Sequence, residues 1–159
     1  MRLLWTRLDG QEGHAAAYGL LAKAAGTPLP EIRRTPQGKP YFPEGKLRFS
    51  ISHTRNHAFC CVSERNVGVD AEEIGRVIDP RLADRLLSPS EKACFDDAPD
   101  KQDCLLRLWV LKESYAKLTG RGFGNYLKNT HFTPDDPAIR EVDGCYVAVL
   151  EDEQPAKSL

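Results

Sequence analysis

The sequence predicts a mixed fold in which a run of strands comes first and a run of helices follows. Three closely spaced segments are typical of short strands: residues 47–52 alternate apolar and polar side chains, residues 58–63 are β-prone, and residues 67–72 form a third such segment. Helix start signals then replace the strand pattern, and a long helix is expected over about residues 100–119. The strand run suggests a small antiparallel sheet.

The segments around this sheet are predicted from their hydrophobic pattern and from the glycines and prolines that end helices and strands. Residues 2–8 alternate weakly and suit an edge strand, whereas residues 15–25 are rich in alanine and leucine and form a helix that Gly26 ends. Residues 27–46 are dense in proline and glycine, so this segment is expected to be a loop. A last strand is expected over residues 145–150, followed by a loose charged tail from Glu151.

The helices of the second half carry recognisable caps. Asp79 is the expected N-cap of a helix that runs through residue 87, with proline at its first helical position. Ser88 and Glu91 form a capping box, because each side chain can accept from the other residue's backbone amide. Gly120 ends the long helix, and further glycines at positions 122 and 124 predict a flexible turn.

The bulk composition is that of a soluble globular protein. The 159 residues are 28% charged and 41% hydrophobic, and the formal net charge is −1. A whole-molecule basic field for nucleic acid is therefore excluded, and any bound anion needs a local basic cluster. The five cysteines include no CxxC pair, which indicates free thiols rather than disulfides or a zinc site. Residues 1–10 resemble neither a signal peptide nor a membrane span, so we expect a cytoplasmic protein.

Two acidic residues of the third predicted strand are candidates for metal binding. Asp70 and Glu72 lie two positions apart, so their side chains leave the same face of the strand, roughly 6–7 Å apart. Magnesium accepts two such carboxylates and fills its other positions with water and phosphate oxygens. The alternative is a solvated acidic strand end, and for the pair alone this alternative is favoured.

The long predicted helix carries a second charged group. Glu113 and Lys117 share one face, four residues apart, and Lys112 flanks them. Such a pair is usually an exposed salt bridge worth only about 0.3–0.5 kcal/mol. A third carboxylate with two lysines is also what a magnesium and diphosphate site requires.

His53 closes the first predicted strand and is followed by Thr54 and Arg55, a combination that can grip a phosphate. The turn at Gly38-Lys39-Pro40 carries little meaning by itself. The remaining histidines show no metal-ligand spacing, and no P-loop, GxSxG, HExxH or dinucleotide motif is present. These pieces gain meaning only from their order along the chain.

Taken in order, the pieces resemble a known family. Gly38-Lys39-Pro40, Phe49-Ser50-Ile51-Ser52-His53, Gly68-Val69-Asp70-Ala71-Glu72 and Trp109-x-x-Lys112-Glu113-x-x-x-Lys117 follow one another as in the 4′-phosphopantetheinyl transferase superfamily. The match is to its longer, monomeric subclass, the surfactin-synthetase-activating type. The resemblance covers about residues 33–125. Many relatives carry asparagine where this chain has Ser50.

The resemblance implies an α+β fold of two similar α+β halves related by a pseudo-twofold axis, residues 1–66 and 67–159, with coenzyme A in the cleft between them. It implies that a magnesium ion is held by three carboxylates: Asp70, Glu72 and Glu113. It places the nucleotide end of coenzyme A on five residues: Arg34, Lys39, Pro40, Ser52 and His53. It also implies that Lys112 and Lys117 neutralise phosphate charge.

The implied reaction moves the phosphopantetheine arm of coenzyme A to a serine of an apo acyl or peptidyl carrier protein, with release of adenosine 3′,5′-bisphosphate. Glu113 and Lys117 are the expected catalytic residues, and either Glu113 or a magnesium-bound water is the expected base. Only 37 residues precede Gly38, so the first half is shorter than in longer relatives. The basic residues that longer relatives contribute from this region have no assigned counterpart here, and Arg2, Arg7 and Lys23 are guesses.

Two other functions are compatible with these residues: a non-catalytic module that binds coenzyme A or a carrier protein, and an unrelated magnesium phosphohydrolase. The carboxylates Asp70, Glu72 and Glu113 argue against the binding module. Both sets of motifs lie on one chain, so a monomer is expected.

Overall fold

The computed structural model describes residues 1–153 and contains two three-stranded sheets. The first has the order β1-β5-β4, built from β1 (Arg2–Arg7), β5 (His57–Ser63) and β4 (Arg48–His53). The second has the order β6-β8-β7, built from β6 (Val67–Glu73), β8 (Cys145–Glu151) and β7 (Ile139–Val142). Neighbouring strands are antiparallel in both. The α+β class is thus confirmed, but the expected single sheet is wrong, because β6 pairs with β8 and not with β5.

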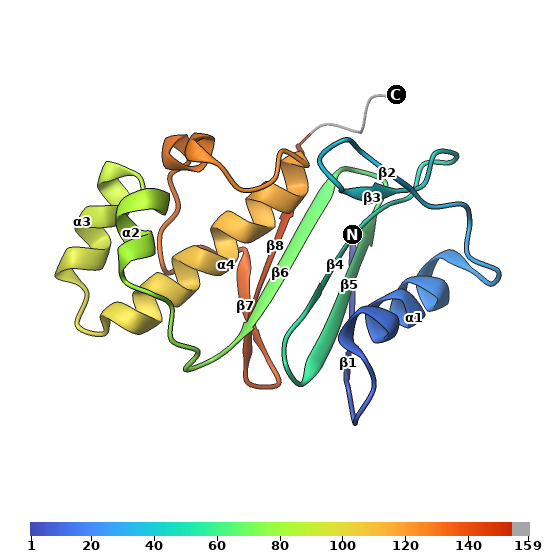
Figure 1. Cartoon of the computed structure of the whole chain (residues 1–159), viewed down its shortest axis with the longest axis horizontal. Coiled ribbons are helices and arrows are strands. Elements are labelled where there is room, and N and C mark those ends of the chain that lie inside the picture. Colours follow the sequence, from blue (N-terminus) through green and yellow to red (C-terminus); the bar gives the residue numbers. More distant parts are fainter. Residues whose placement is uncertain (154–159) are drawn as a thin grey trace.

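The two sheets are connected by the same plan. In the first half, β1 leads through α1 (Gly13–Ala25) to β4 and β5; in the second, β6 leads through α4 (Lys101–Thr119) to β7 and β8. In each half the third strand takes the central position of the sheet. Figure 1 shows the two halves side by side, with α4 over one sheet and α1 over the other. The halves therefore share one topology, while the pseudo-twofold axis stays a prediction.

Smaller elements fill the connections. The loop before β4 contains a two-residue ribbon, β2 (Arg33–Arg34) with β3 (Pro40–Tyr41). Around α4 lie α2 (Arg81–Leu86), α3 (Pro89–Asp97) and the 3-10 helix η1 (Asn125–Asn129). The sequence did not predict β2, β3, η1 or β7.

Local caps explain where the helices begin and end. The capping box of α3 is present, since Ser88 Oγ accepts from the amide of Glu91 and the Glu91 carboxylate accepts from the amide of Ser88. Asp100 caps α4, and Gly120 ends it in the left-handed conformation at φ 68°. Helix α2 begins at Arg81, one residue later than expected, because Pro80 takes the cap position.

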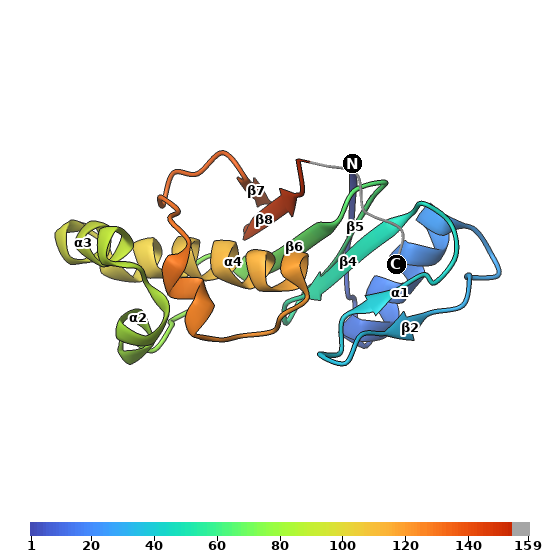
Figure 2. The same ribbon diagram turned by 90° about the horizontal axis from the view of Figure 1, so that it is seen from above.

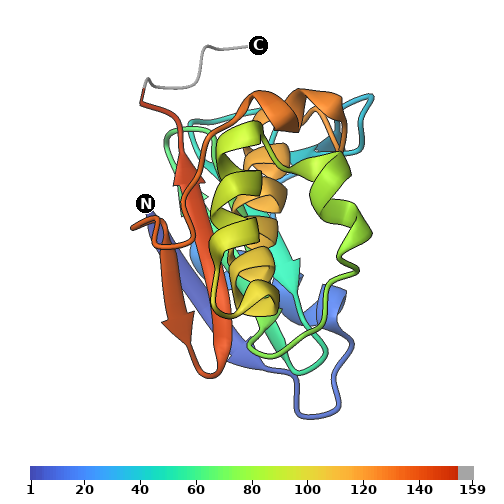
Figure 3. The same cartoon turned by 90° about the vertical axis from the view of Figure 1, so that its left-hand side faces the viewer.

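The strands alternate between two apolar layers. On β5, Ala58, Cys60 and Val62 pack under α1, whereas Phe59 and Cys61 face the second sheet. Phe59 and Cys61 pack against alternate apolar residues of the second sheet: Val67, Val69, Ala71, Cys145, Val147 and Val149. The molecule is therefore a stack of α1, first sheet, second sheet and α4, and Figure 3 views this stack from the α4 side. All five cysteines are free thiols, as expected.

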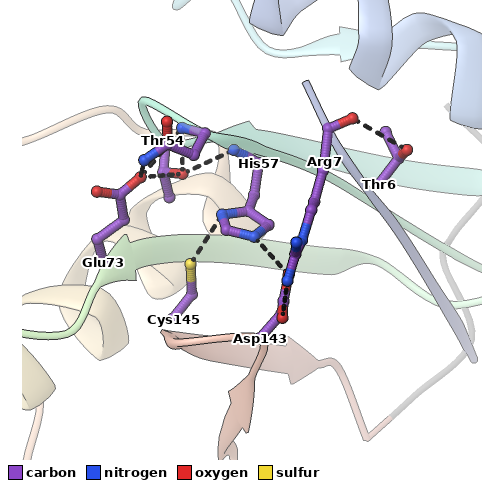
Figure 4. A network of polar contacts seen from close by, with 8 residues as sticks. Thr6, Arg7, Thr54, His57, Glu73, Asp143 and Cys145 are labelled. Carbon is purple, nitrogen blue, oxygen red and sulfur yellow. Dashed lines mark hydrogen bonds and ion pairs between the residues drawn. The ribbon is translucent and has the colours of Figure 1, made fainter. Parts of the chain in front are cut away.

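A polar network, which we call the clasp, joins the two halves (Figure 4). The Arg7 guanidinium donates to both carboxylate oxygens of Asp143 at 2.6 and 2.7 Å. His57 Nε2 lies 2.8 Å from the same carboxylate, and its Nδ1 lies 3.5 Å from the sulfur of Cys145. Arg7 and His57 belong to the first half and Asp143 and Cys145 to the second, so the clasp links the ends of their sheets.

The two sheets are also connected through the turn after β5, in which Asn66, the expected boundary of the halves, lies. Asn66 donates to Asp152 at 2.8 Å, and Ser63 donates to Glu151, so the expected loose tail is bonded at its start. The rest of that tail, residues 154–159, lies outside the described residues. Among residues 1–153 no helix is long and apolar enough to span a bilayer.

Candidate functional site

The site begins at the seam where β4 of the first sheet runs beside β6 of the second (Figure 2). Two serines of β4 bond across this seam. Ser50 Oγ accepts from the amide of Val69 at 3.0 Å, and Ser52 Oγ donates to Asp70 Oδ1 at 3.0 Å. The end of β4, with Ser52 and His53, is thereby fixed beside the acidic stretch of β6.

Helix α4 lies unusually close to β6, because position 68 is glycine. A Cβ on Gly68 would lie 2.5 Å from the amide nitrogen of Leu118 and closer still to the carbonyl of Ser114. Ser114 Oγ uses this closeness and donates to Gly68 O at 2.9 Å. The contact sets the helix so that Lys117 Nζ donates to Asp70 Oδ1 at 2.7 Å and to Ile51 O at 3.4 Å.

The three expected metal ligands line one cavity of about 390 Å³ between the halves, together with Ser52, His53 and Lys117. Burial, and then the charges of Asp70 and Glu72, raise the pKa of Glu113 to about 7, while Lys117 opposes the rise. Burial also raises the pKa of Glu72, against the hydrogen bond from Arg76. The cavity therefore holds mutually repelling carboxylates that a cation would stabilise.

The donor set fits a hard divalent cation in its chemistry. All three candidate ligands are carboxylates, and Asp70 Oδ2 is buried without a hydrogen-bond partner. Two of the carboxylates have cationic partners of their own, Lys117 on Asp70 and Arg76 on Glu72. Within residues 1–153, no three Asp, Glu, His or Cys side chains are grouped as a ready coordination shell. A bound cation would therefore have to exchange with these ion pairs.

The histidine end of the cavity is shaped by α1. The side chain of His53 packs against Gly13, where a Cβ would lie 2.7 Å from His53 Cγ. His14 follows in α1, with its ring centroid 6.1 Å from that of His53, and lines the same cavity. His14 was not predicted as a site residue, because only the folded chain brings α1 to the end of β4.

A second cavity of about 330 Å³ adjoins the first and shares Glu113 and Lys117 with it. Lys39 and Pro40 form part of its lining from the first half. Arg34 stands beside this loop, where it donates to Gly38 O at 2.9 Å and to the hydroxyl of Tyr18 at 3.4 Å. The structure thus brings Arg34, Lys39 and Pro40 together beside the second cavity, whereas Ser52 and His53 line the first.

Lys112 is the expected site residue that the structure does not bring to the site. Its ammonium is fully buried, 2.5 Å from Glu91 Oε2, and donates to Leu127 O and to Thr130 Oγ1 at 2.6 and 2.7 Å. Lys112 and Glu113 are adjacent on α4, and a helix turns by about 100° per residue, so they point to different sides. The role of Lys112 as a phosphate contact is therefore corrected to a structural ion pair.

Comparison with known proteins now bears on this arrangement. A model of the 4′-phosphopantetheinyl transferase superfamily matches residues 66–155, more than half of the chain. The chain belongs to the 4′-phosphopantetheinyl transferase superfamily. The matched residues contain β6 and α4, which supply the three carboxylates and Lys117.

Curated 4′-phosphopantetheinyl transferases are similar to part of this chain. The 4′-phosphopantetheinyl transferase HetI of Nostoc sp. is 36% identical over 111 residues, which are 64% of this chain and 47% of HetI. A 4′-phosphopantetheinyl transferase of Bacillus subtilis is 35% identical over 112 residues, 68% of this chain and 47% of the relative. AcpT of Escherichia coli K12 is 40% identical over 103 residues, 59% and 51% of the two chains. The chain spans about half the length of these relatives.

Two residues to which the sequence assigned no role in the site, Arg76 and Trp109, also line the cavity. Arg76 follows β6 and pairs with Glu72, and Trp109 lies on α4 beside the carboxylates. The indole Nε1 of Trp109 is buried without a partner. Trp109 is partly buried against the core of the second half, so it lies between that core and the cavity. The first-half candidates Arg2 and Arg7 bond elsewhere, to Ala24 O and Asp143.

Proposed function

We propose that this chain transfers the 4′-phosphopantetheine arm of coenzyme A to a serine of an apo acyl or peptidyl carrier protein and releases adenosine 3′,5′-bisphosphate. The relatives bear the name of this activity, and the chain shares their superfamily. The observation that carries the proposal is the single cavity at the seam. Ser52 and His53 enter it from β4, Asp70 and Glu72 from β6, and Glu113 and Lys117 from α4.

The reaction needs charge compensation and a proton acceptor. The serine oxygen attacks the phosphorus that bears the pantetheine arm; the new O–P bond forms as the bond to the departing bisphosphate breaks. Lys117, at the floor of the cavity, balances the charge on the leaving phosphate. Glu113 lies at the junction of both cavities and accepts the serine proton. The seam aligns the two substrates, which lowers the entropic barrier.

The nucleotide end of coenzyme A is assigned to Arg34, Pro40, Ser52 and His53, with His53 and Ser52 at its 3′-phosphate. Magnesium would be held by Asp70, Glu72 and Glu113, where it supplies positive charge to the diphosphate. The unpartnered Asp70 oxygen and the repulsion among the carboxylates support this assignment. Removal of divalent ions with a chelator should stop transfer, and added magnesium should restore it.

The alternative is a module of the same fold that binds coenzyme A or a carrier protein without reaction. The retained carboxylates favour the enzyme, since a passive binding site would not need to keep three repelling carboxylates together. Incubation with coenzyme A, magnesium and a panel of apo carriers decides between them by intact mass. A mass gain of one phosphopantetheine on a carrier supports the transferase, whereas binding without any mass gain supports the module.

Asp70→Asn tests the site directly. Removal of this charge should lower the rate of transfer by roughly 10²–10³-fold, the effect typical of losing one electrostatic contact in an active site. Glu64→Gln, at an exposed acidic position outside the cavity, is the matched control and should leave the rate unchanged. Full activity of Asp70→Asn would overturn the assignment of the cavity.

We further propose that the active species is a monomer, because one chain supplies every side chain named in the cavity. Light scattering over a dilution series, with activity measured on the same samples, tests this. A specific activity that falls as an oligomer dissociates would show that the site is shared between chains. The cytoplasmic location expected from the sequence stays a prediction.

A further inference from the structure

Lys39 is bonded to the protein backbone in a way that its expected role as a nucleotide ligand does not explain. Its ammonium donates to Leu118 O at 2.8 Å and to Val67 O at 3.5 Å. Leu118 lies in the last turn of α4, whose final carbonyls have no partner within the helix. Lys39 therefore caps the C-terminal end of α4 from a loop of the first half, with the favourable charge for that end.

The rest of the Lys39 side chain is also fitted to this end of α4. A Cβ on Gly120, the residue that ends the helix, would lie 3.1 Å from Lys39 Cδ and 3.6 Å from its Cβ. Lys39 is half-buried, and this burial lowers its pKa to about 8. Lys39 also lines the second cavity, but its ammonium is bonded to backbone carbonyls.

The capped turn is the part of α4 that carries the chemistry. Glu113 and Lys117 lie one turn apart immediately before Leu118, and Lys117 bonds Asp70. Ser114 also holds this turn of α4 on β6, because its hydroxyl donates to the backbone carbonyl of Gly68. Loss of the cap would free the last turn, so Lys117 would no longer be held against Asp70.

We propose that Lys39 is a positioning residue for the transfer reaction: it latches the loop of the first half to the last turn of α4 and so holds Lys117 and Glu113 in place. The inference rests on the proposed function, because it assigns how that site is kept assembled. It replaces the assignment of Lys39 as a ligand of the nucleotide.

The kinetic test compares Lys39→Met with Lys46→Met, an exposed lysine of the same loop. For Lys39→Met we expect kcat to fall by roughly tenfold or more, as for loss of a charge-assisted hydrogen bond. The KM for coenzyme A and the Kd for adenosine 3′,5′-bisphosphate should change less than about twofold, because no phosphate contact is lost. Lys46→Met should match the parent. A rise in the KM and the Kd with an unchanged kcat would overturn the proposal.

Amide hydrogen exchange supplies a readout that does not need transfer activity. In Lys39→Met the amides of residues 113–120 should exchange faster by roughly tenfold or more, whereas Lys46→Met leaves them unchanged. Unaltered exchange in Lys39→Met would refute the latch even if the chain proves to be an active transferase. Faster exchange in a chain that transfers nothing would support the latch and refute the proposed function.

A second variant covers the case in which Lys39→Met fails to fold. Gly120→Ala keeps the lysine charge but presses on Lys39 Cδ and strains the left-handed end of the helix. It should also lower kcat and speed exchange over residues 113–120 without weakening the binding of adenosine 3′,5′-bisphosphate. A Gly120→Ala chain with the exchange and kcat of the parent would contradict the proposal.

Discussion

Single glycines decide how closely side chains of the site approach their neighbours. His53 is assigned to the 3′-phosphate of coenzyme A, and its ring lies where a side chain on Gly13 would otherwise stand. Gly13→Ala would place a Cβ 2.7 Å from His53 Cγ, so the imidazole would have to rotate away. A substitution on α1 should therefore disturb nucleotide binding without removing the histidine.

We expect Gly13→Ala to weaken binding of coenzyme A by several-fold and binding of 3′-dephospho-coenzyme A much less, because only the first ligand has the phosphate to lose. Isothermal titration with both ligands measures the difference. Gly19→Ala, in the same helix with nothing within 4 Å of the added Cβ, is the control and should bind both ligands as the parent does. Equal losses for the two ligands in Gly13→Ala would contradict the role of His53.

Lys112 was predicted from its motif to contact phosphate, but it forms a buried ion pair with Glu91. Both side chains are fully buried, and the Glu91 carboxylate also accepts from the amides of Ser88 and Phe132. Lys112→Met leaves this carboxylate without a counter-charge, which should cost about 3–5 kcal/mol of unfolding free energy. The double variant Lys112→Met/Glu91→Gln should lose less, because no unpaired charge remains. Urea denaturation measures both; a loss below about 1 kcal/mol in Lys112→Met would refute a structural pair.

At the scale of elements, the contact between β6 and α4 depends on one residue without a side chain. Gly68→Ala would force the strand and the helix apart, because the clashing atoms are backbone of Ser114 and Leu118 that cannot rotate away. We expect a loss of about 1–3 kcal/mol or more in unfolding free energy. Gly19→Ala should instead stabilise the protein by about 0.5–1 kcal/mol, as for glycine in an exposed helix. A Gly68→Ala chain as stable as the parent would disprove the close contact.

The elements that the sequence predicted well are those whose ends are set locally. The capping box of Ser88 with Glu91 and the glycine at position 120 act within one turn, so the bounds of α3 and α4 could be read from the chain. Strand pairing is different, because it joins distant residues. Nothing near residues 67–72 indicates that β6 pairs with β8, about eighty residues later.

Strand β7 was missed although a signal was present. Asp143-Gly144 stands between Val142 and Cys145, and both central residues have positive φ, 46° and 78°. This is the dipeptide typical of a two-residue hairpin turn, and it marks the end of one strand and the start of the next. The three carboxylates of the candidate site could be predicted, because they belong to motifs that are recognised by their order along the chain. The contacts of Lys39, Lys112 and His14 were not, since they depend on which elements the fold brings together.

At the scale of the whole molecule, the geometry of the site depends on the joint between the halves, because both halves line the cavity. The seam is held near the cavity by Ser50 and Ser52, and farther across the same strand ends by the clasp of Arg7, His57 and Asp143. The clasp is polar and electrostatic, whereas the layer between the sheets is apolar. The clasp should therefore make part of the joint's stability depend on pH, beside the carboxylates of Asp70, Glu73 and Glu151 that also accept from the first half.

Asp143→Asn tests this, because asparagine keeps the left-handed turn geometry of position 143 while it removes the charge. The hydrogen bonds from Arg7 and then from His57 hold the pKa of Asp143 well below its usual range. A carboxylate with a lowered pKa contributes stability above its unfolded value, about 3.9, and loses it as the pH falls through the folded value. The parent should therefore melt at a higher temperature than Asp143→Asn at pH 7.

The gap between the two melting temperatures should narrow as the pH falls below about 4, since the unfolded parent then takes up a proton at Asp143 that the folded carboxylate still resists. High salt at pH 7 should narrow it too, because Arg7 is largely exposed and its attraction to Asp143 is screened. Thermal melts of both chains from pH 7 downward, at low and high salt, provide the measurement. A gap that is the same at every pH would show that the charge of Asp143 does not cause it, and the clasp would then contribute nothing as a charged link between the halves.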